Sequence, residues 1–371
     1  MILILLIVFI INLAGIYFVF YYDATAYTYI NTGAVSGTFV FYNDKGDELA
    51  FFKKKGEIEN IRIYNFATND FKDYPLPETL EVKKADNLVF SPDSKQIVFT
   101  VKEGDDTVIN LLNFDDGSVV SLKNILANPK LSYTDSGEPV RTISWLDNDR
   151  LVYVNSISFE RNGVVIVNLK SGQEEKFINK AKKPKLSNDK TKLAYVVGSE
   201  DGKSIEVEVI NLGDAKATTL VKDIKGYPNV LAWSGQDKKI ALGYSFFDEK
   251  VSLRKVMIID ENGQVESISE NKLLAAPQWA DEDNIIVVEY QSLGVVVRLE
   301  SVDGIYLYDI RTKEYKKITS KIQSESYSIS PDKKKIISSM GNQGLLIIDI
   351  EATLKPNTLD KLRNYLGIHS L

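Results

Sequence analysis

The sequence predicts an all-β fold, a β-propeller of seven four-stranded blades, and three observations lead to this prediction. A unit of apolar strand, polar turn and second apolar strand recurs along most of the 371 residues. Successive copies lie 42 to 54 residues apart, which is the length of a propeller blade. A third apolar segment and a more polar fourth segment follow most copies. Six or eight blades are the alternatives, because the first copy is the weakest.

Residues 90–100 contain the clearest copy of the repeat. Pro92 presets the backbone for a turn, and the Asp93 side chain can accept a hydrogen bond from the backbone just after it. Ile97, Val98 and Phe99 then resume a β-branched and aromatic run, which is typical of a strand. This stretch is therefore predicted to form a hairpin.

Two apolar positions align the other copies. The residues that restart the second strand are Leu49, Ile97, Leu151, Leu193, Ile240, Ile285 and Ile336. The residues that end the first strand are Phe41, Phe90, Trp145, Leu186, Trp233, Trp279 and Ile329. All three tryptophans share a position with leucine and isoleucine, so we expect them to pack between blades rather than to form an aromatic ligand cage.

A carboxylate stands four residues before the restarting residue in five copies. These residues are Asp93, Asp147, Asp189, Asp281 and Asp332. A ring of metal ligands or acid–base pairs is one interpretation. Their constant place in a tight turn favours turn stabilisation instead.

The two ends of the repeat region predict how the ring closes. The last unit lacks a fourth strand of its own, and residues 24–37 are either a linker or a strand that supplies it, with 27–32 acting as a latch. The propeller is expected over residues 38–355. A short C-terminal helix or tail is expected over 356–371, where leucines and a tyrosine share one helical face.

Residues 1–23 are predicted to be a transmembrane anchor or an uncleaved signal. Residues 1–22 carry no charged side chain, and as a helix they would span about 33 Å, enough for a bilayer core. Aromatic residues crowd the end of this run, as they do at membrane interfaces. We expect a single-pass protein of the cell membrane with its propeller on the extracytoplasmic side; secretion after cleavage near Ala26 is the alternative.

Two hairpins carry a resemblance to a known family. Ser91-Pro92-Asp93-Ser94-Lys95 and Ser330-Pro331-Asp332-Lys333-Lys334 resemble the WD40-like repeat of TolB-type β-propellers, whose pattern is F-S-P-D-G-K followed by an apolar strand. The resemblance implies a propeller over roughly residues 38–350. The chain departs from the pattern because no glycine follows either aspartate, and it lacks space for the α/β domain of TolB. The role of TolB is therefore not transferred.

Composition excludes several classes of chemistry. The chain has no cysteine and a single histidine, His369, so one chain cannot build a histidine-dependent triad, a thiolate zinc site or a multi-histidine metal site. A net charge of −6 argues against nucleic acid as a partner. No phosphate-binding, dinucleotide-binding or serine-hydrolase motif is present, and no cofactor is expected.

The longer loops are the candidate binding surface. In four-stranded meanders, the loops between second and third strands and between blades emerge on one face. Residues 124–141, 155–162, 244–254 and 290–303 belong to this set. Their aromatic and arginine residues, which are types enriched at interfaces, are Tyr133, Arg141, Phe159, Arg161, Phe246, Phe247, Arg254 and Arg298. The alternative is that these segments are extended hairpins whose aromatic residues pack on neighbouring blades.

The resulting hypothesis is a non-catalytic, membrane-anchored scaffold. It would bind another envelope protein or a surface glycan through the longer loops, and the membrane through its N-terminal helix. The alternative is a glycan hydrolase or lyase that works with carboxylates alone. Paired carboxylates about 5 to 10 Å apart at a pocket on the same face would favour that alternative.

Overall fold

The structure is a computed structural model. It describes residues 27–30, 35–55, 57–77, 85–103, 106–122, 143–156, 162–199, 204–214, 216–248, 251–292, 300–321, 327–339 and 344–354. The predicted helices over 1–23 and 356–371 lie outside these residues. Within them, no helix is long and apolar enough to cross a membrane.

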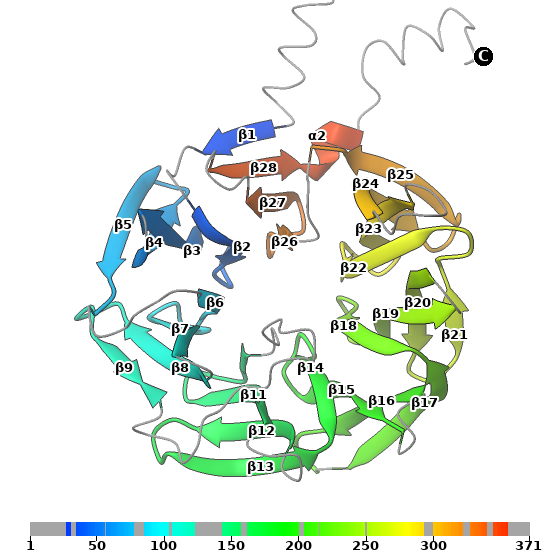
Figure 1. Cartoon of the computed structure of the whole chain (residues 1–371), viewed down its shortest axis with the longest axis horizontal. Helices are drawn as coiled ribbons and strands as arrows, with labels where there is room; N and C mark the ends of the chain where they lie inside the picture. The colour runs from blue at the N-terminus through cyan, green and yellow to red at the C-terminus, as the bar shows by residue number, and fades with distance from the viewer. Residues whose placement is uncertain are drawn as a thin grey trace, which may run out of the picture.

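The described residues form seven four-stranded antiparallel sheets arranged in a ring (Figure 1). This arrangement confirms the all-β propeller, and the described part of the chain makes seven blades rather than six or eight. Six blades use four consecutive strands each. Blade one is β2 (Val35–Tyr42), β3 (Glu48–Lys55), β4 (Glu57–Asn65) and β5 (Asp70–Pro75); blade two is β6 (Ala85–Phe90), β7 (Gln96–Glu103), β8 (Asp106–Asn113) and β9 (Val119–Ser121); blade three is β10 (Ser144–Trp145), β11 (Arg150–Ser156), β12 (Asn162–Asn168) and β13 (Gln173–Asn179).

The same order continues through the second half of the ring. Blade four is β14 (Ala181–Leu186), β15 (Lys192–Gly198), β16 (Ser204–Asn211) and β17 (Ala217–Lys225); blade five is β18 (Tyr227–Trp233), β19 (Lys239–Asp248), β20 (Val251–Asp260) and β21 (Val265–Ser267); blade six is β22 (Leu273–Trp279), β23 (Asn284–Ser292), β24 (Glu300–Asp309) and β25 (Glu314–Thr319). The first strands β2, β6, β14, β18 and β22 lie nearest the centre of the ring in their blades (Figure 1).

Blade seven joins the two ends of the described chain. Its strands β26 (Tyr327–Ile329), β27 (Lys335–Ser339) and β28 (Leu345–Asp349) are followed by the short helix α2 (Ile350–Leu354). Its outer strand is β1 (Tyr27–Ile30), which pairs antiparallel with β28 from Tyr27 opposite Ile348 to Ile30 opposite Leu345. Residues 27–30 therefore form the closing strand, and they give β28 a partner on both of its sides.

The repeat positions fall in register, with one correction. The residue that restarts each second strand is at most 1% exposed, and it pairs with the residue that ends the first strand, as Ile97 does with Phe90. In blade one the partner of Leu49 is Tyr42 rather than Phe41. The reason is that buried Asn43 occupies the place that Ser91 has in blade two. The backbone amide of Asn43 donates to the Glu48 carbonyl, and the backbone amide of Ser91 donates to the Gln96 carbonyl in the same way.

Second strands are buried on both faces because each blade packs between two others. In β7, Ile97 and Phe99 belong to the cluster shared with blade one, whereas Val98 belongs to the cluster shared with blade three. This explains why these strands are continuous apolar runs rather than alternating ones.

The turns between first and second strands explain the missing glycines of the repeat. Ser94, Lys190, Asp237 and Lys333 occupy the same turn position with φ of 59°, 61°, 56° and 62°, and Gly46 occupies it in blade one with φ of 76°. A left-handed backbone is the conformation that glycine adopts most easily. Blades two, four, five and seven adopt it with a serine, lysine or aspartate.

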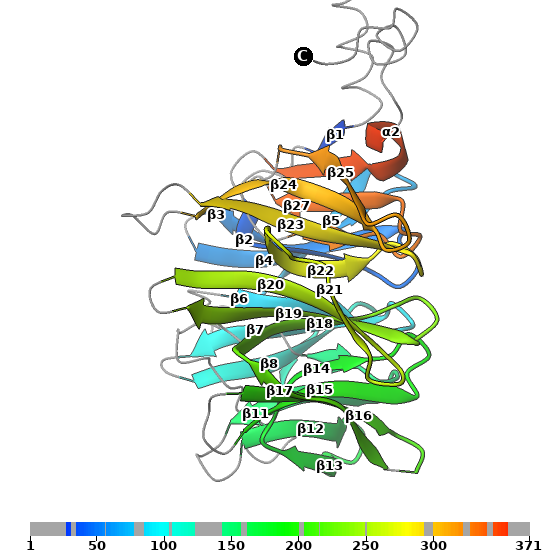
Figure 2. The same cartoon turned by 90° about the vertical axis from the view of Figure 1, so that its right-hand side faces the viewer.

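Strands run between two faces of the ring (Figure 2). We call the face with the turns between first and second strands the turn face. The face with the connections between second and third strands is the loop face.

Candidate functional site

Most of the predicted loop residues lie outside the described part of the chain. These are Tyr133, Arg141, Phe159, Arg161 and Arg298. The backbone of Phe247 lies in β19, but its side chain is outside the description. Phe246 and Arg254 are the two candidates whose side chains can be placed.

Two of the predicted loops are largely hairpin. Residues 244–254 are paired in β19 and β20 as far as Asp248 opposite Val251. Residues 290–303 are likewise paired in β23 and β24 as far as Ser292 opposite Glu300. The structure therefore supports the alternative of extended hairpins for these two segments. The outer parts of these strands carry the mixed polarity of a loop while keeping the ladder of a strand.

The two candidates point in different directions. Arg254 is opposite Ser245, and Phe246 is opposite Leu253, so the side chains of Phe246 and Arg254 lie on opposite faces of the hairpin. The Arg254 guanidinium lies 4.5 Å from the centre of the Tyr290 ring in blade six. This cation–π contact joins the two blades at the loop face.

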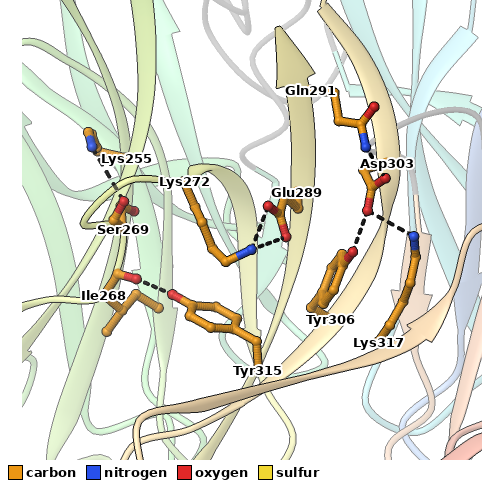
Figure 3. Close-up of polar contacts among 10 residues, drawn as sticks. All are labelled: Lys255, Ile268, Ser269, Lys272, Glu289, Gln291, Asp303, Tyr306, Tyr315 and Lys317. Carbon is orange, nitrogen blue, oxygen red and sulfur yellow. Dashed lines mark hydrogen bonds and ion pairs between the residues drawn. The ribbon is translucent and has the colours of Figure 1, made fainter. Parts of the chain in front are cut away.

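A polar cluster of blades five and six lies toward the same face (Figure 3). Lys272, just before β22, places its ammonium nitrogen 2.6 and 2.7 Å from the two Glu289 carboxylate oxygens. The same nitrogen is 5.0 Å from the centre of the Tyr315 ring and 5.4 Å from that of Tyr306. One lysine thus combines an ion pair with two aromatic contacts.

Asp303 is the second carboxylate of this cluster. It accepts hydrogen bonds from the Lys317 ammonium at 2.9 Å, from the Tyr306 hydroxyl and from the Gln291 amide. The Lys317 and Tyr306 bonds hold the pKa of Asp303 below its usual range. Burial and the Asp303 bond raise the pKa of Tyr306, so the phenol stays protonated and continues to donate.

Blade five contributes backbone acceptors. The Lys255 ammonium bonds the carbonyl oxygens of Glu270 at 2.9 Å and Ser269 at 3.4 Å. The Tyr315 hydroxyl donates to the Ile268 carbonyl. We call Lys255, Lys272, Glu289, Gln291, Asp303, Tyr306, Tyr315 and Lys317 the blade 5–6 cluster. No sequence pattern predicts this cluster, because its members come from separate segments without a common spacing.

The arrangement suits binding better than proton transfer. Both carboxylates already face a lysine. A general acid of a glycosidase needs a raised pKa, whereas the pKa of Asp303 is lowered. Among the described residues, no group of three histidines, cysteines, aspartates or glutamates could hold a metal ion.

The tryptophans have a structural role, as predicted. Each indole nitrogen donates to a backbone carbonyl in the first strand of the preceding blade. The bonds run from Trp145 to Val89 (3.0 Å), from Trp233 to Lys185 (2.9 Å) and from Trp279 to Ala232 (3.0 Å). This repeated bond confirms inter-blade packing over a ligand cage.

The repeated carboxylates stabilise turns, which confirms the second structural prediction. In each case one carboxylate oxygen accepts a hydrogen bond from the backbone amide two residues later. The pairs are Asp93 with Lys95, Asp147 with Asp149, Asp189 with Thr191, Asp281 with Asp283 and Asp332 with Lys334. These oxygens are therefore engaged in local structure.

Comparisons with known proteins agree on the fold. No family model and no curated protein matches the chain. Among solved structures, an oligogalacturonate lyase in complex with manganese has a TM-score of 0.57 and 12% identity over 89% of this chain and 98% of that one. The β-propeller domain of Myceliophteria thermophila Cps50 (Swd1) has a TM-score of 0.54 and 11% identity over 87% and 98%.

A third structure allows a topological contrast. The β-propeller domain of the Trilobed protease from Pyrococcus furiosus has a TM-score of 0.53 and 15% identity over 83% of this chain and 90% of that one, and is described as having an open velcro topology. Here β1 pairs with β28 and closes the ring. At these identities the likeness establishes the propeller fold and leaves the TolB type of repeat a prediction.

Proposed function

We propose that this protein is a non-catalytic binding scaffold, anchored in the cell membrane by residues 1–23 with its propeller on the extracytoplasmic side. It engages another envelope protein or a surface glycan through the loop face of blades five and six. The alternative to an anchor is secretion after cleavage near Ala26, and the mass-spectrometry experiment below distinguishes the two.

The observation that carries the proposal is the chemistry of that face. Arg254 stacked on Tyr290, together with the blade 5–6 cluster, concentrates arginine, lysine and tyrosine, and arginine and tyrosine are enriched at binding hot spots. Fixed side chains lose little entropy on binding. The Lys272 and Lys317 side chains are 35% and 41% exposed, so a partner could still reach them.

The competing function is a carboxylate-dependent glycan hydrolase or lyase. The similarity of fold to an oligogalacturonate lyase favours this alternative. The ion pairs that Glu289 and Asp303 form with lysines argue against this alternative. Assays of the full chain on acidic polysaccharides test it: turnover that disappears in both Glu289→Gln and Asp303→Asn would favour the enzyme over the scaffold.

Capture from membranes tests the binding face. The intact chain, Arg254→Ala and Lys170→Ala are compared as baits. Lys170 is a matched control because its side chain is 75% exposed and ion-paired with Asp149 at the turn face. We expect partners to be lost with Arg254→Ala and kept with Lys170→Ala. Retention of every partner by Arg254→Ala contradicts the proposed face.

Mass spectrometry of the mature chain tests the anchor. An intact N-terminus in the membrane fraction is expected. A soluble chain that begins at Tyr27 would replace the anchored scaffold with a secreted one.

A further inference from the structure

The outer edge of blade seven carries aromatic side chains that the proposed function does not use. Tyr27 and Tyr29 alternate with Thr28 and Ile30 along β1, so the two tyrosines lie on one face of the strand. That face is turned toward blade six, because the Tyr27 hydroxyl donates to the Thr319 hydroxyl at the end of β25, at 3.3 Å. Ile30 packs on the other side, in the cluster shared with blade one.

Lys321 joins these tyrosines from the blade-six side. Its ammonium nitrogen lies 3.8 Å from the centre of the Tyr27 ring and 5.9 Å from that of the Tyr29 ring. The same nitrogen donates to the Tyr29 hydroxyl at 3.4 Å. The Lys321 backbone amide donates to the Thr319 hydroxyl at 3.0 Å. These contacts bring the three side chains together at the seam between blades six and seven, and we call Tyr27, Tyr29 and Lys321 the rim cluster.

The rim cluster presents amphipathic side chains to its surroundings. Tyr29 is 56% exposed, and among the described residues it is the most exposed large apolar side chain on an outer strand. Tyrosine combines an apolar ring with a polar hydroxyl, and lysine combines an apolar stem with a charged end. Tyrosine is enriched at membrane–water interfaces, and an ammonium group is attracted to anionic headgroups. The cluster therefore has the chemistry of a lipid-facing surface.

The same edge is the part of the described chain that follows the predicted anchor. Residues 24–26 alone separate the predicted anchor, 1–23, from Tyr27 at the start of β1, and β1 lies at the outside of the ring (Figure 1). The four residue steps from 23 to 27 cover at most about 14 Å when fully extended. Crossing the headgroup layer on one side of a bilayer takes about 5–7 Å of that length. An anchor over 1–23 therefore holds β1 close to the membrane surface.

We propose that the rim cluster is a lipid-contact site, which seats the outer edge of blades six and seven on the headgroup layer of the membrane. The inference rests on the anchor of the proposed function and adds an orientation to it. The Tyr29 ring enters the headgroup layer, and the Lys321 ammonium lies against the phosphates of anionic lipids. The outer edge lies between the turn face and the loop face (Figure 2). A propeller seated on this edge leaves both faces open to partners.

Fluorescence quenching tests the site on the full chain reconstituted in vesicles of phosphatidylcholine and phosphatidylglycerol. The chain has no cysteine, so one fluorophore can be attached at a single introduced cysteine. The label positions are Thr28→Cys on β1, Ser320→Cys beside Lys321, and Thr218→Cys on β17 of blade four, all at exposed residues. β17 lies across the ring from β1 (Figure 1). With a nitroxide on the lipid headgroups, we expect strong quenching at Thr28 and Ser320 and little at Thr218.

The label at Ser320 separates this inference from the anchor. Thr28 follows the anchor closely along the chain, so its label is quenched whenever the anchor holds. Ser320 is distant from the anchor along the chain, and its label is quenched when the rim cluster rests on lipid. Quenching at Thr28 with no more quenching at Ser320 than at Thr218 overturns the lipid-contact site and leaves the anchor standing. A chain that does not float with the vesicles overturns both.

Substitutions in the Ser320→Cys chain test the side chains themselves. Lys321→Met should lower the ratio of seated to unseated chains about fivefold on these vesicles and less than about twofold on phosphatidylcholine alone, whereas Tyr29→Ser should lower it on both. The controls are Tyr227→Ser, at a 57% exposed tyrosine of β18, and Lys170→Met, at a 75% exposed lysine. Unchanged quenching in both rim variants, or an equal loss in the controls, overturns the proposal. The comparison of label positions needs none of these substitutions, so it decides the question if a variant misfolds.

Discussion

The repeated tryptophan bond predicts the stability of the ring in a form that can be measured. Trp279 is almost fully buried, and its indole nitrogen is 3.0 Å from the Ala232 carbonyl oxygen of the preceding blade. Trp279→Phe keeps an aromatic ring in place and removes the donor. The change therefore isolates the bond that links blades five and six.

The expected cost combines two effects. Leaving the buried Ala232 carbonyl without a donor costs about 1–3 kcal/mol. The smaller ring loses roughly 1 kcal/mol of packing. The sum is about 2–4 kcal/mol, which at roughly 2 °C per kcal/mol for a chain of this size corresponds to a lower melting temperature by about 4–8 °C.

Thermal unfolding followed by circular dichroism measures the shift. Trp145→Phe should give a similar value, because its bond to Val89 has the same length. Tyr29→Phe, at a side chain that is 56% exposed, is the control and should change stability by less than about 0.5 kcal/mol. A shift below about 1 °C for Trp279→Phe, or very different shifts for the two tryptophans, would refute a common inter-blade role.

Three further predictions concern strand contact, ring closure and pH. Gly163→Ala should lower the free energy of unfolding in urea by about 1–3 kcal/mol, because a β-carbon at this position would overlap a backbone carbonyl of the next strand. Gly198→Ala is the control and should be neutral, because the space around Gly198 is open. Equal costs for the two variants would contradict this reasoning. Ile30→Ala removes a buried contact of the closing strand and should lower the free energy of unfolding by about 2–3 kcal/mol. It should also speed amide hydrogen exchange in β28. Unchanged exchange in β28 would show that ring closure does not depend on Ile30. The pKa of Asp303 is lowered in the folded state, so the stability that ionised Asp303 contributes is present above the unfolded pKa of about 3.9 and is lost as pH falls through the lower folded value. The difference in free energy of unfolding between the native chain and Lys317→Met should therefore shrink in acid. A difference that does not change with pH would contradict the Asp303–Lys317 ion pair.

Local patterns explain why the blades could be predicted. Apolar pairs such as Phe90 and Ile97 recur at a nearly fixed separation, and each hairpin is a short-range structure whose residues are close in sequence. The aligned positions therefore marked the correct strands, including the weak first blade. The one-residue error at Phe41 arose because Asn43 replaces the usual serine, and only the paired register reveals that.

The candidate site was much less predictable. Composition drew attention to Phe246 and Arg254 in a presumed loop, yet the hairpin pairing puts them on opposite faces. Asp303 and Lys272 carried no motif. Their hydrogen-bond partners lie on neighbouring strands of blade six, and the register of those strands is not encoded in any single spacing.

The sequence by itself determined the repeat and the structural roles of the tryptophans and turn aspartates, and it favoured seven blades over six or eight, because these depend on local pairing and on equivalent positions. Only the tertiary structure decided that β1 closes the ring and that Arg254 stacks on Tyr290. The physical reason is distance along the chain: the Arg254–Tyr290 contact forms only when two blades pack together, and the pairing of β1 with β28 forms only when the ring is complete.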